Sequence, residues 1–205
     1  MNKGIALTVL LLFSTVVLSQ NIVTNFEDQK KKAIKMEFFS PLTGNTTIGY
    51  ESYIRDWLSW ELKVGFIGLG TDNSNLNPGG VLIKGGPKFK LNPDFVTSDL
   101  KGAHLLGGKY IRPEIVFSQY SEDVENFDGG GNFSTSRKSF TSVAFLITYG
   151  RQYVLAETMT LDYHIGVGYG YDSSEDGKYN YSHSNGTPDF PIAVSAGFTV
   201  GFLLK

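Results

Sequence analysis

The chain has 205 residues, no cysteine, 24 glycines, 14% aromatic residues and a formal net charge of −2. The absence of cysteine excludes disulfides and thiolate metal sites, and the near-neutral charge gives no electrostatic reason to expect a nucleic-acid partner. The length suits one domain with a sizeable core.

The first segment, residues 1–19, has the features of a secretory signal peptide. A positively charged start precedes an apolar run that ends at Leu18, and the small residue Ser19 follows it. The run is shorter than the ~20 residues of a membrane-spanning helix. Residues 20–32 are predicted to form a polar N-terminal tail, and residues 33–205 a single β-barrel domain.

The remaining sequence alternates apolar residues with small or polar ones, in segments separated by turn signals, which predicts β-strands. Eight strands are expected, over residues 33–39, 46–55, 59–69, 81–91, 105–119, 138–153, 159–171 and 192–205. Two of them contain a proline, which cannot donate a hydrogen bond to the strand ladder. A β-bulge is therefore expected near Pro87 or Pro113.

The last segment, Ile192 to Lys205, has the clearest pattern. One face carries bulky apolar residues, and the other carries mainly Ala, Ser, Gly and Thr. Small residues opposite an apolar face suit the crowded interior of a narrow barrel, and the segment is long enough to cross a bilayer with a tilt. The pattern predicts the closing strand of an all-β, eight-stranded antiparallel up-and-down transmembrane β-barrel.

The connections between the predicted strands differ in length. Those after the second and sixth strands are tight, whereas long polar segments follow the third, fifth and seventh strands, at Thr71–Gly80, Tyr120–Arg137 and Asp172–Asp189. Short periplasmic turns and long outer loops are typical of outer-membrane barrels. The three long segments are therefore expected to be outer loops that are available for surface contacts.

Charged side chains of both signs occupy the faces opposite the apolar stripes. An eight-stranded barrel has an interior that side chains just fill, and buried charges must be paired or hydrated. We therefore predict an interior charge network in a plugged barrel without a wide pore. Its expected members are Lys35, Glu37, Glu51, Arg55, Glu61, Lys63, Lys84, Lys88, Lys90, Arg112, Glu114, Asp162 and His164.

Alternation by itself does not decide which face points inward, because a soluble barrel would hold the apolar stripes inside and the charges outside. Three observations favour the apolar faces outside: the expected signal peptide, aromatic residues near strand ends as in an interfacial girdle, and glycines on the opposite faces. A soluble periplasmic ligand-binding barrel is the alternative. A second alternative is a narrow anion pore lined by Lys84, Lys88 and Lys90.

The sequence predicts no catalytic, metal or cofactor site. His164 shares a face with Asp162, His104 and His183 lie in connections, and no G-x-S-x-G nucleophile motif occurs. The glycine-rich runs do not precede a helix, as a phosphate site would require, and the acidic residues of the second long connection lack calcium-loop spacing. These observations favour a non-enzymatic barrel. A membrane-embedded lipid-modifying enzyme that uses His164 or His104 is the alternative.

The run KKAIKMEFF, a short turn and then TTIGYESYIRDWLSWELKVGFIGLG resemble the opening of small eight-stranded outer-membrane β-barrel domains of Gram-negative bacteria, with OmpA/OmpX-like architecture. The resemblance rests on pattern and covers essentially the whole mature chain. It implies a cell outer-membrane location, contact with outer-membrane lipid, and the barrel-assembly machinery as a partner during biogenesis. Many such barrels end in Phe, whereas this chain ends in Lys205. The expected role is envelope structure or surface interaction.

Overall fold

A computed structural model describes residues 29–72, 75–92, 104–128, 132–173, 180–187 and 189–205. The signal peptide predicted for residues 1–19 lies outside these residues. The elements are β1 (Lys32–Glu37), the 3-10 helix η2 (Ser40–Thr43), β2 (Asn45–Arg55), β3 (Leu58–Ile67), β4 (Gly79–Asn92), β5 (Gly108–Asp128), β6 (Asn132–Leu155), β7 (Met159–Asp172), β8 (Ser184–Asn185) and β9 (Ile192–Leu204). Within the described residues, no helix is long and apolar enough to cross a membrane.

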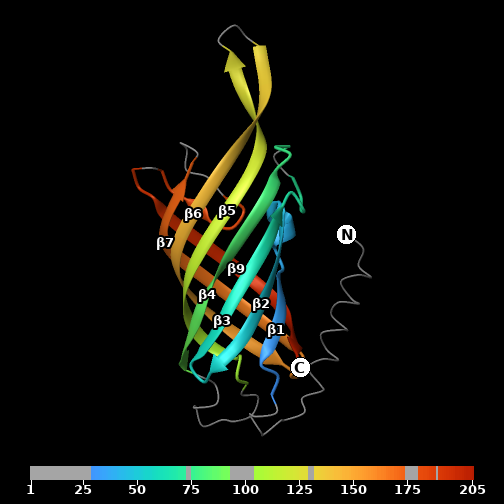
Figure 1. Ribbon diagram of the computed structural model, residues 1–205, viewed down its shortest axis with the longest axis vertical. Helices are drawn as coiled ribbons and strands as arrows, with labels where there is room; N and C mark the ends of the chain where they lie inside the picture. Colours follow the sequence, from blue (N-terminus) through green and yellow to red (C-terminus); the bar gives the residue numbers. More distant parts are fainter. Residues whose placement is uncertain (1–28, 73–74, 93–103, 129–131, 174–179, 188) are drawn as a thin grey trace, which may run out of the picture.

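All the strands belong to one antiparallel sheet in the order β1-β2-β3-β4-β5-β6-β7-β9-β8, and β9 also pairs with β1. The eight long strands therefore form a ring, visible in Figure 1. This confirms the predicted all-β up-and-down architecture. Among the described residues the strand count is nine rather than eight, because the two residues of β8 pair with Val194 and Ala193 of β9. Two residues inside a polar connection have no periodicity that could reveal them.

The two ends of the barrel differ in shape. One end carries the C-terminus and the tight β2–β3 and β6–β7 turns, and we call it the turn end. At the other end, the arm end, β5 and β6 continue beyond their neighbours as a two-stranded arm (Figure 1). The pairing of β4 with β5 stops at Ser121, and that of β6 with β7 stops at Ser142, whereas β5 and β6 stay paired up to Asp128 and Asn132.

The arm corrects the prediction of a loop over Tyr120–Arg137. Beyond Ser121 and Ser142 the ribbon pairs with neither β4 nor β7 and is no longer part of the barrel wall, so its sequence lacks the apolar alternation of that wall. Cross-strand hydrogen bonds hold it together instead, with every residue from Tyr120 to Asp128 opposite a residue of β6.

The prolines of β4 and β5 lie opposite each other and do not cause the predicted bulge. The pairs on either side follow one register, Gly85 with Ile115 and Phe89 with Ile111. The β4–β5 register shift lies instead between Lys90 and Asn92. Proline lacks the N–H group of the ladder. Because the two prolines lie opposite each other, both missing N–H groups fall at one position of the β4–β5 ladder, and the register continues past it.

Gly86 is required by this close approach, since a Cβ atom there would overlap the carbonyl oxygen of Pro113. We expect Gly86→Ala to lower the free energy of unfolding by about 1–3 kcal/mol, because the backbone must move to relieve the overlap. Urea unfolding of the folded protein measures the change. Gly79→Ala in the same strand is the control, because its Cβ would meet only the flexible end of Arg137, at 3.3 Å. Equal stability of the two variants would contradict the expectation.

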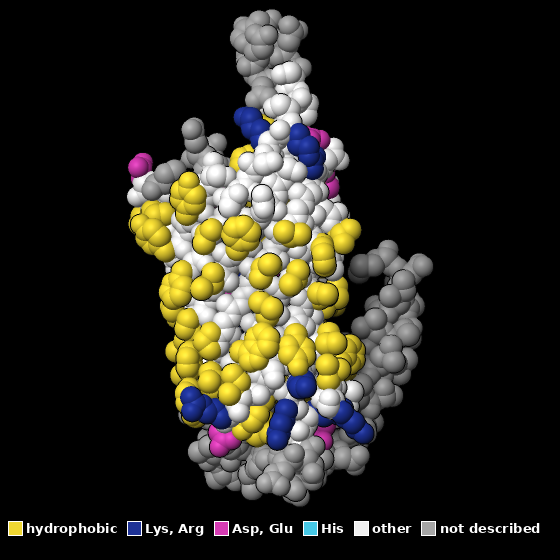
Figure 2. Space-filling view, viewed as in Figure 1, with side chains coloured by type: hydrophobic (Ala, Val, Ile, Leu, Met, Phe, Trp, Pro, Cys, Tyr) yellow, Lys and Arg dark blue, Asp and Glu magenta, His cyan; other side chains and the backbone are white. Residues whose placement is uncertain are grey.

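The outer wall of the barrel is apolar. Figure 2 shows hydrophobic side chains spread over the wall, with Lys and Arg side chains beyond them at both ends. The exposed fraction reaches 62% for Ile115, 60% for Ile165 and 57% for Phe202. If this wall faced water, its exposure would cost roughly 25 cal/mol of free energy for each Å² of apolar surface.

The interior combines apolar layers with a polar middle. Two apolar clusters lie toward the arm end; the buried members of one are Ile67, Leu82 and Tyr120, and those of the other are Val116, Ala144, Leu146 and Ala193. A third, the Leu106 layer, lies toward the turn end, with Ala33, Leu106 and Leu203 as its buried members. Between them the inward side chains are charged, and these buried charges form the candidate functional site.

Candidate functional site

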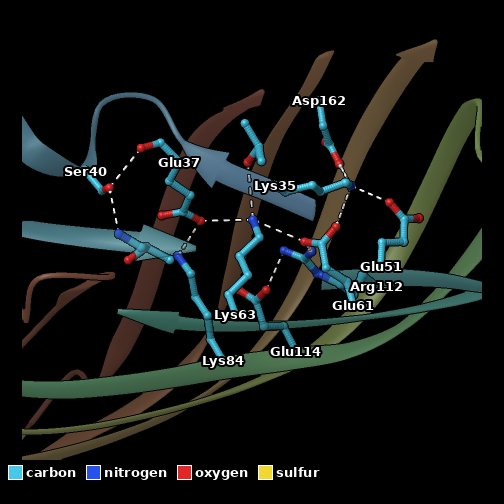
Figure 3. Close-up of polar contacts among 12 residues, drawn as sticks. Lys35, Glu37, Ser40, Glu51, Glu61, Lys63, Lys84, Arg112, Glu114 and Asp162 are labelled. Carbon is cyan, nitrogen blue, oxygen red and sulfur yellow. Dashed lines mark hydrogen bonds and ion pairs between the residues drawn. The ribbon is translucent and has the colours of Figure 1, made fainter. Parts of the chain in front are cut away.

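The middle of the barrel holds one connected network of ion pairs, in which five cations meet five carboxylates. The cations are Lys35, Lys63, Lys84, Lys88 and Arg112, and the carboxylates are Glu37, Glu51, Glu61, Glu114 and Asp162. Figure 3 shows these side chains, Lys88 excepted, converging from strands on opposite sides of the ring. Equal numbers of both signs allow the low-dielectric interior to hold ten charges without a net charge.

Glu61 on β3 is the centre of the network. Its carboxylate oxygens lie 2.7 Å from the ammonium nitrogens of both Lys35 and Lys88, and 3.1 Å from that of Lys63. It also pairs with the guanidinium of Arg112. Glu61 is only 1% exposed, so these four cations replace the water that its carboxylate would otherwise bind.

Lys35 and Lys88 form the part of the network nearer the turn end. Asp162 Oδ2 lies 2.6 Å from Lys88 Nζ and 3.3 Å from Lys35 Nζ. Both ammonium groups also pair with Glu51 and donate to the Gln152 side chain. Tyr110 donates a 2.7 Å hydrogen bond to Asp162. Six strands thus meet here, which ties opposite walls of the barrel together.

Glu37 forms the part nearer the arm end. Its Oε1 atom lies 3.0 Å from Lys63 Nζ and 2.7 Å from Lys84 Nζ. Lys63 and Lys84 are directly opposite each other on β3 and β4, where two like charges would repel. A carboxylate reaching both of them from β1 removes that conflict.

Of the residues predicted for the network, Arg55 is placed outside. Its side chain is exposed and its guanidinium lies 4.0 Å from the ring centroid of Trp57. The reason is a register shift between Tyr53 and Arg55 at the end of β2, because one extra residue reverses the faces of those that follow. The other twelve predicted residues point inward; Glu37 is partly buried and the remaining eleven are buried.

Two further inward residues are Lys90 and His164. Lys90 lies nearer the turn end, with its Nζ atom 6.0 Å from the ring centroid of Tyr53. His164 is buried beside Gly197, where a Cβ atom would lie 2.5 Å from the imidazole Cε1. Glycine at this place makes room for the histidine ring.

A narrow anion pore lined by Lys84, Lys88 and Lys90 requires lysines whose charge is not balanced by carboxylates of the chain. Lys84 pairs with Glu37, and Lys88 pairs with Glu51, Glu61 and Asp162. These two lysines therefore do not meet the requirement, because their charge is already balanced by carboxylates of this chain.

Part of the β4–β5 connection folds into the turn end of the barrel. His104, Leu105 and Leu106 are buried, with at most 5% exposure. The Leu105 N–H donates to the side-chain oxygen of Gln29, and the Leu106 N–H donates to His104 Nδ1. Burial, together with the charge of Lys90, lowers the pKa of His104 to about 4. This histidine is therefore neutral at pH 7.

The connection between β7 and β9 folds into the arm end. Asn180 is completely buried and its side-chain oxygen accepts a 2.8 Å hydrogen bond from Tyr120. Tyr181 donates to Glu122, and the Tyr181 carbonyl accepts from Asn45. The loop predicted at Asp172–Asp189 is thus partly an internal cap, held by polar contacts that sequence periodicity cannot reveal.

His183 lies in the same cap and comes within reach of two hydroxyl groups. Its Nε2 atom is 3.3 Å from Ser142 Oγ, and its Nδ1 atom is 2.8 Å from Ser182 Oγ. A hydrolytic triad would need a carboxylate at the second nitrogen. Burial, together with the charge of Lys84, lowers the pKa of His183 to about 4. Among the described residues, no group of His, Asp and Glu is arranged to hold a metal ion.

A small cavity interrupts the wall where β1 ends before β9 does. The β1–β9 pairing ends at Glu37 and Thr199, and β8 takes up the same edge only at Val194. The cavity measures about 70 Å³, and its lining includes Glu37, Ser40, Asn45, Tyr181, Ala196 and Phe198. Small-molecule sites measure about 300–1,000 Å³. This one has room for a few water molecules.

No protein-family model and no curated protein matches this chain. Among solved structures, it is similar to the crystal structure of the N-terminal β-barrel domain of Pseudomonas aeruginosa OprF. The identity is 14%, the match covers 86% of this chain and 98% of the other, and the TM-score is 0.37.

Proposed function

We propose that the chain is a closed transmembrane barrel of the bacterial outer membrane, non-enzymatic, with a role in envelope structure or in surface interaction. The inverted polarity of the barrel carries this proposal. Charges fill the inside and apolar side chains cover the outside, which is the reverse of the arrangement in a soluble ligand-binding barrel.

The height of the apolar wall supports a membrane location. Outward-facing pairs along β5 and β6 are apolar from Ile111 with Tyr149 to Phe117 with Val143. Charged Lys109 and Arg151 stand before them, and polar Gln119 and Thr141 after them. From Lys109 to Gln119 the strand rises roughly 33 Å, which corresponds to about 25 Å along the membrane normal at the usual tilt of about 40°. That height matches the hydrophobic band of outer-membrane barrels.

The filled interior supports a closed barrel. An open path for solutes needs a water-filled core, as in barrels of 16 or more strands. Here the ion-pair network occupies the middle, the Leu106 layer lies toward the turn end, and the Tyr181 cap lies toward the arm end.

The arm and the β3–β4 connection are then the surfaces left for contacts outside the membrane. Arg137 joins them, with a 3.1 Å ion pair to Asp123 and a hydrogen bond to the Asn77 carbonyl.

Fractionation and gel mobility test the membrane barrel. We expect the mature protein in the outer-membrane fraction, with faster mobility before boiling than after it, because a folded barrel resists detergent at room temperature. Recovery in the soluble periplasmic fraction would contradict the proposal and would favour the soluble alternative.

Planar-bilayer recording tests closure. We expect the reconstituted protein to add no conductance steps to the bilayer. Discrete small steps that change size when Lys84 or Lys88 is neutralised would contradict the closed barrel and support the narrow pore.

A further inference from the structure

The surface charges of the two barrel ends are strongly unequal. Among the described residues, the turn end has seven cationic side chains at least partly exposed and two carboxylates, and the arm end has two cations and five carboxylates. The turn-end charges are Lys30, Lys31, Lys32, Arg55, Lys109, Arg151 and Lys205 against Asp56 and Glu157; the arm-end charges are Arg137 and Lys138 against Asp72, Asp123, Glu125, Asp172 and Asp189. The excess of positive charge thus borders only one edge of the apolar wall.

Two of these cations form a pair of like charge at that edge. Lys109 of β5 and Arg151 of β6 are directly opposite each other in the strand register and share the outward face. Like charges in this position destabilise a sheet. Neither side chain forms an ion pair with a carboxylate of the described chain. Among the described residues, this pair of cations therefore has no carboxylate to balance its charge.

Aromatic side chains place the pair at a membrane interface. The Arg151 guanidinium lies 4.6 Å from the ring centroid of Tyr153, and Tyr163 faces Arg151 across the β6–β7 pairing. The rings of Tyr153 and Tyr163 are 6.3 Å apart and both are partly exposed. Tyrosine prefers the level of lipid headgroups, with its ring in the apolar zone and its hydroxyl in water.

We propose that Lys109 and Arg151 bind the phosphate of an anionic phospholipid, so that the turn end lies in a phospholipid leaflet. This inference rests on the proposed membrane barrel. A phosphate between the two side chains would relieve their repulsion, with the planar guanidinium offering two parallel N–H donors and the ammonium a point charge. The acyl chains of the lipid would lie against Ile111 and Tyr149, the next outward pair along the strands.

Lipid titration of the full mature chain, folded in zwitterionic detergent, tests the site. The probes are a short-chain phosphatidylglycerol, the matching phosphatidylcholine and inorganic phosphate, followed by amide NMR shifts at residues 107–111 and 149–153. We expect saturable binding of phosphatidylglycerol. Replacing both cations in Lys109→Gln/Arg151→Gln should weaken it roughly 30-fold, because each cation near an anionic lipid contributes about fivefold.

Two variants serve as controls. The exchange Lys109→Arg/Arg151→Lys keeps both charges and should keep the preference for phosphatidylglycerol. Lys138→Gln removes an exposed cation from the other end of β6 and should leave binding unchanged.

The outcomes separate this inference from the proposed function. Equal affinity for both lipids, in a protein that still shows heat-modifiable mobility, would overturn the headgroup site and leave the membrane barrel intact. Binding of inorganic phosphate as tightly as phosphatidylglycerol would overturn the lipid assignment. A mature chain that stays in solution without detergent would overturn both proposals.

Discussion

Replacing Glu61 by Gln is expected to lower the free energy of unfolding by about 3–5 kcal/mol, the cost of leaving a buried charge without its partner. Glu61 is 1% exposed and pairs with Lys35, Lys63, Lys88 and Arg112. Glutamine keeps the size of the side chain and removes its charge, so four buried cations each lose one carboxylate partner. Urea unfolding in lipid vesicles, followed by gel mobility and tryptophan fluorescence, measures the loss.

Glu125→Gln is the matched control for Glu61→Gln. Glu125 is an exposed carboxylate on the arm, and its neutralisation should change stability by less than about 0.5 kcal/mol. The double variant Glu61→Gln/Lys63→Gln should be less destabilised than the sum of its single changes, because it also removes one of the unbalanced cations. A Glu61→Gln barrel as stable as the control would mean that the network does not hold the interior together.

Lowering the pH from 7 to 4 is expected to destabilise the barrel by about 3 kcal/mol for each of the two buried connection histidines. The pKa of both His104 and His183 in the folded chain is about 4, against about 6.5 for an unfolded histidine. The unfolded chain therefore takes up protons between pH 6.5 and 4, whereas the folded chain does not. Stability is fully present above pH 6.5 and falls as the pH drops through this window.

The double variant His104→Asn/His183→Asn isolates this effect from all other titrating groups. Its free energy of unfolding should depend less on pH between 6.5 and 4 than that of the unchanged protein, whatever its absolute stability. Limited proteolysis at pH 4 should also cut the unchanged protein near residues 104 and 183 first, because protonation favours the exposed form of the two connections. The same pH dependence in both proteins would show that these histidines are accessible to protons in the folded state.

The inward and outward faces of the long strands were predictable from the sequence. Strand side chains alternate with a period of two, so Glu61 and Lys63 share a face whatever the strand pairs with. The same local rule failed at Arg55, where a register shift between Tyr53 and Arg55 reversed the faces. It also failed in the arm, which pairs with neither β4 nor β7 and is no longer part of the barrel wall.

The sequence by itself determined the architecture and the identity of almost all the interior charges, because alternation is a local property that each strand displays alone. Only the tertiary structure decided which cation meets which carboxylate. Lys35 reaches Asp162 across 127 positions of the chain, and that contact depends on the register of every strand around the ring. The inward folding of the connections at His104 and His183 was likewise decided by contacts with residues far away in the sequence, Gln29 and Ser142, for which a polar segment carries no periodic signal.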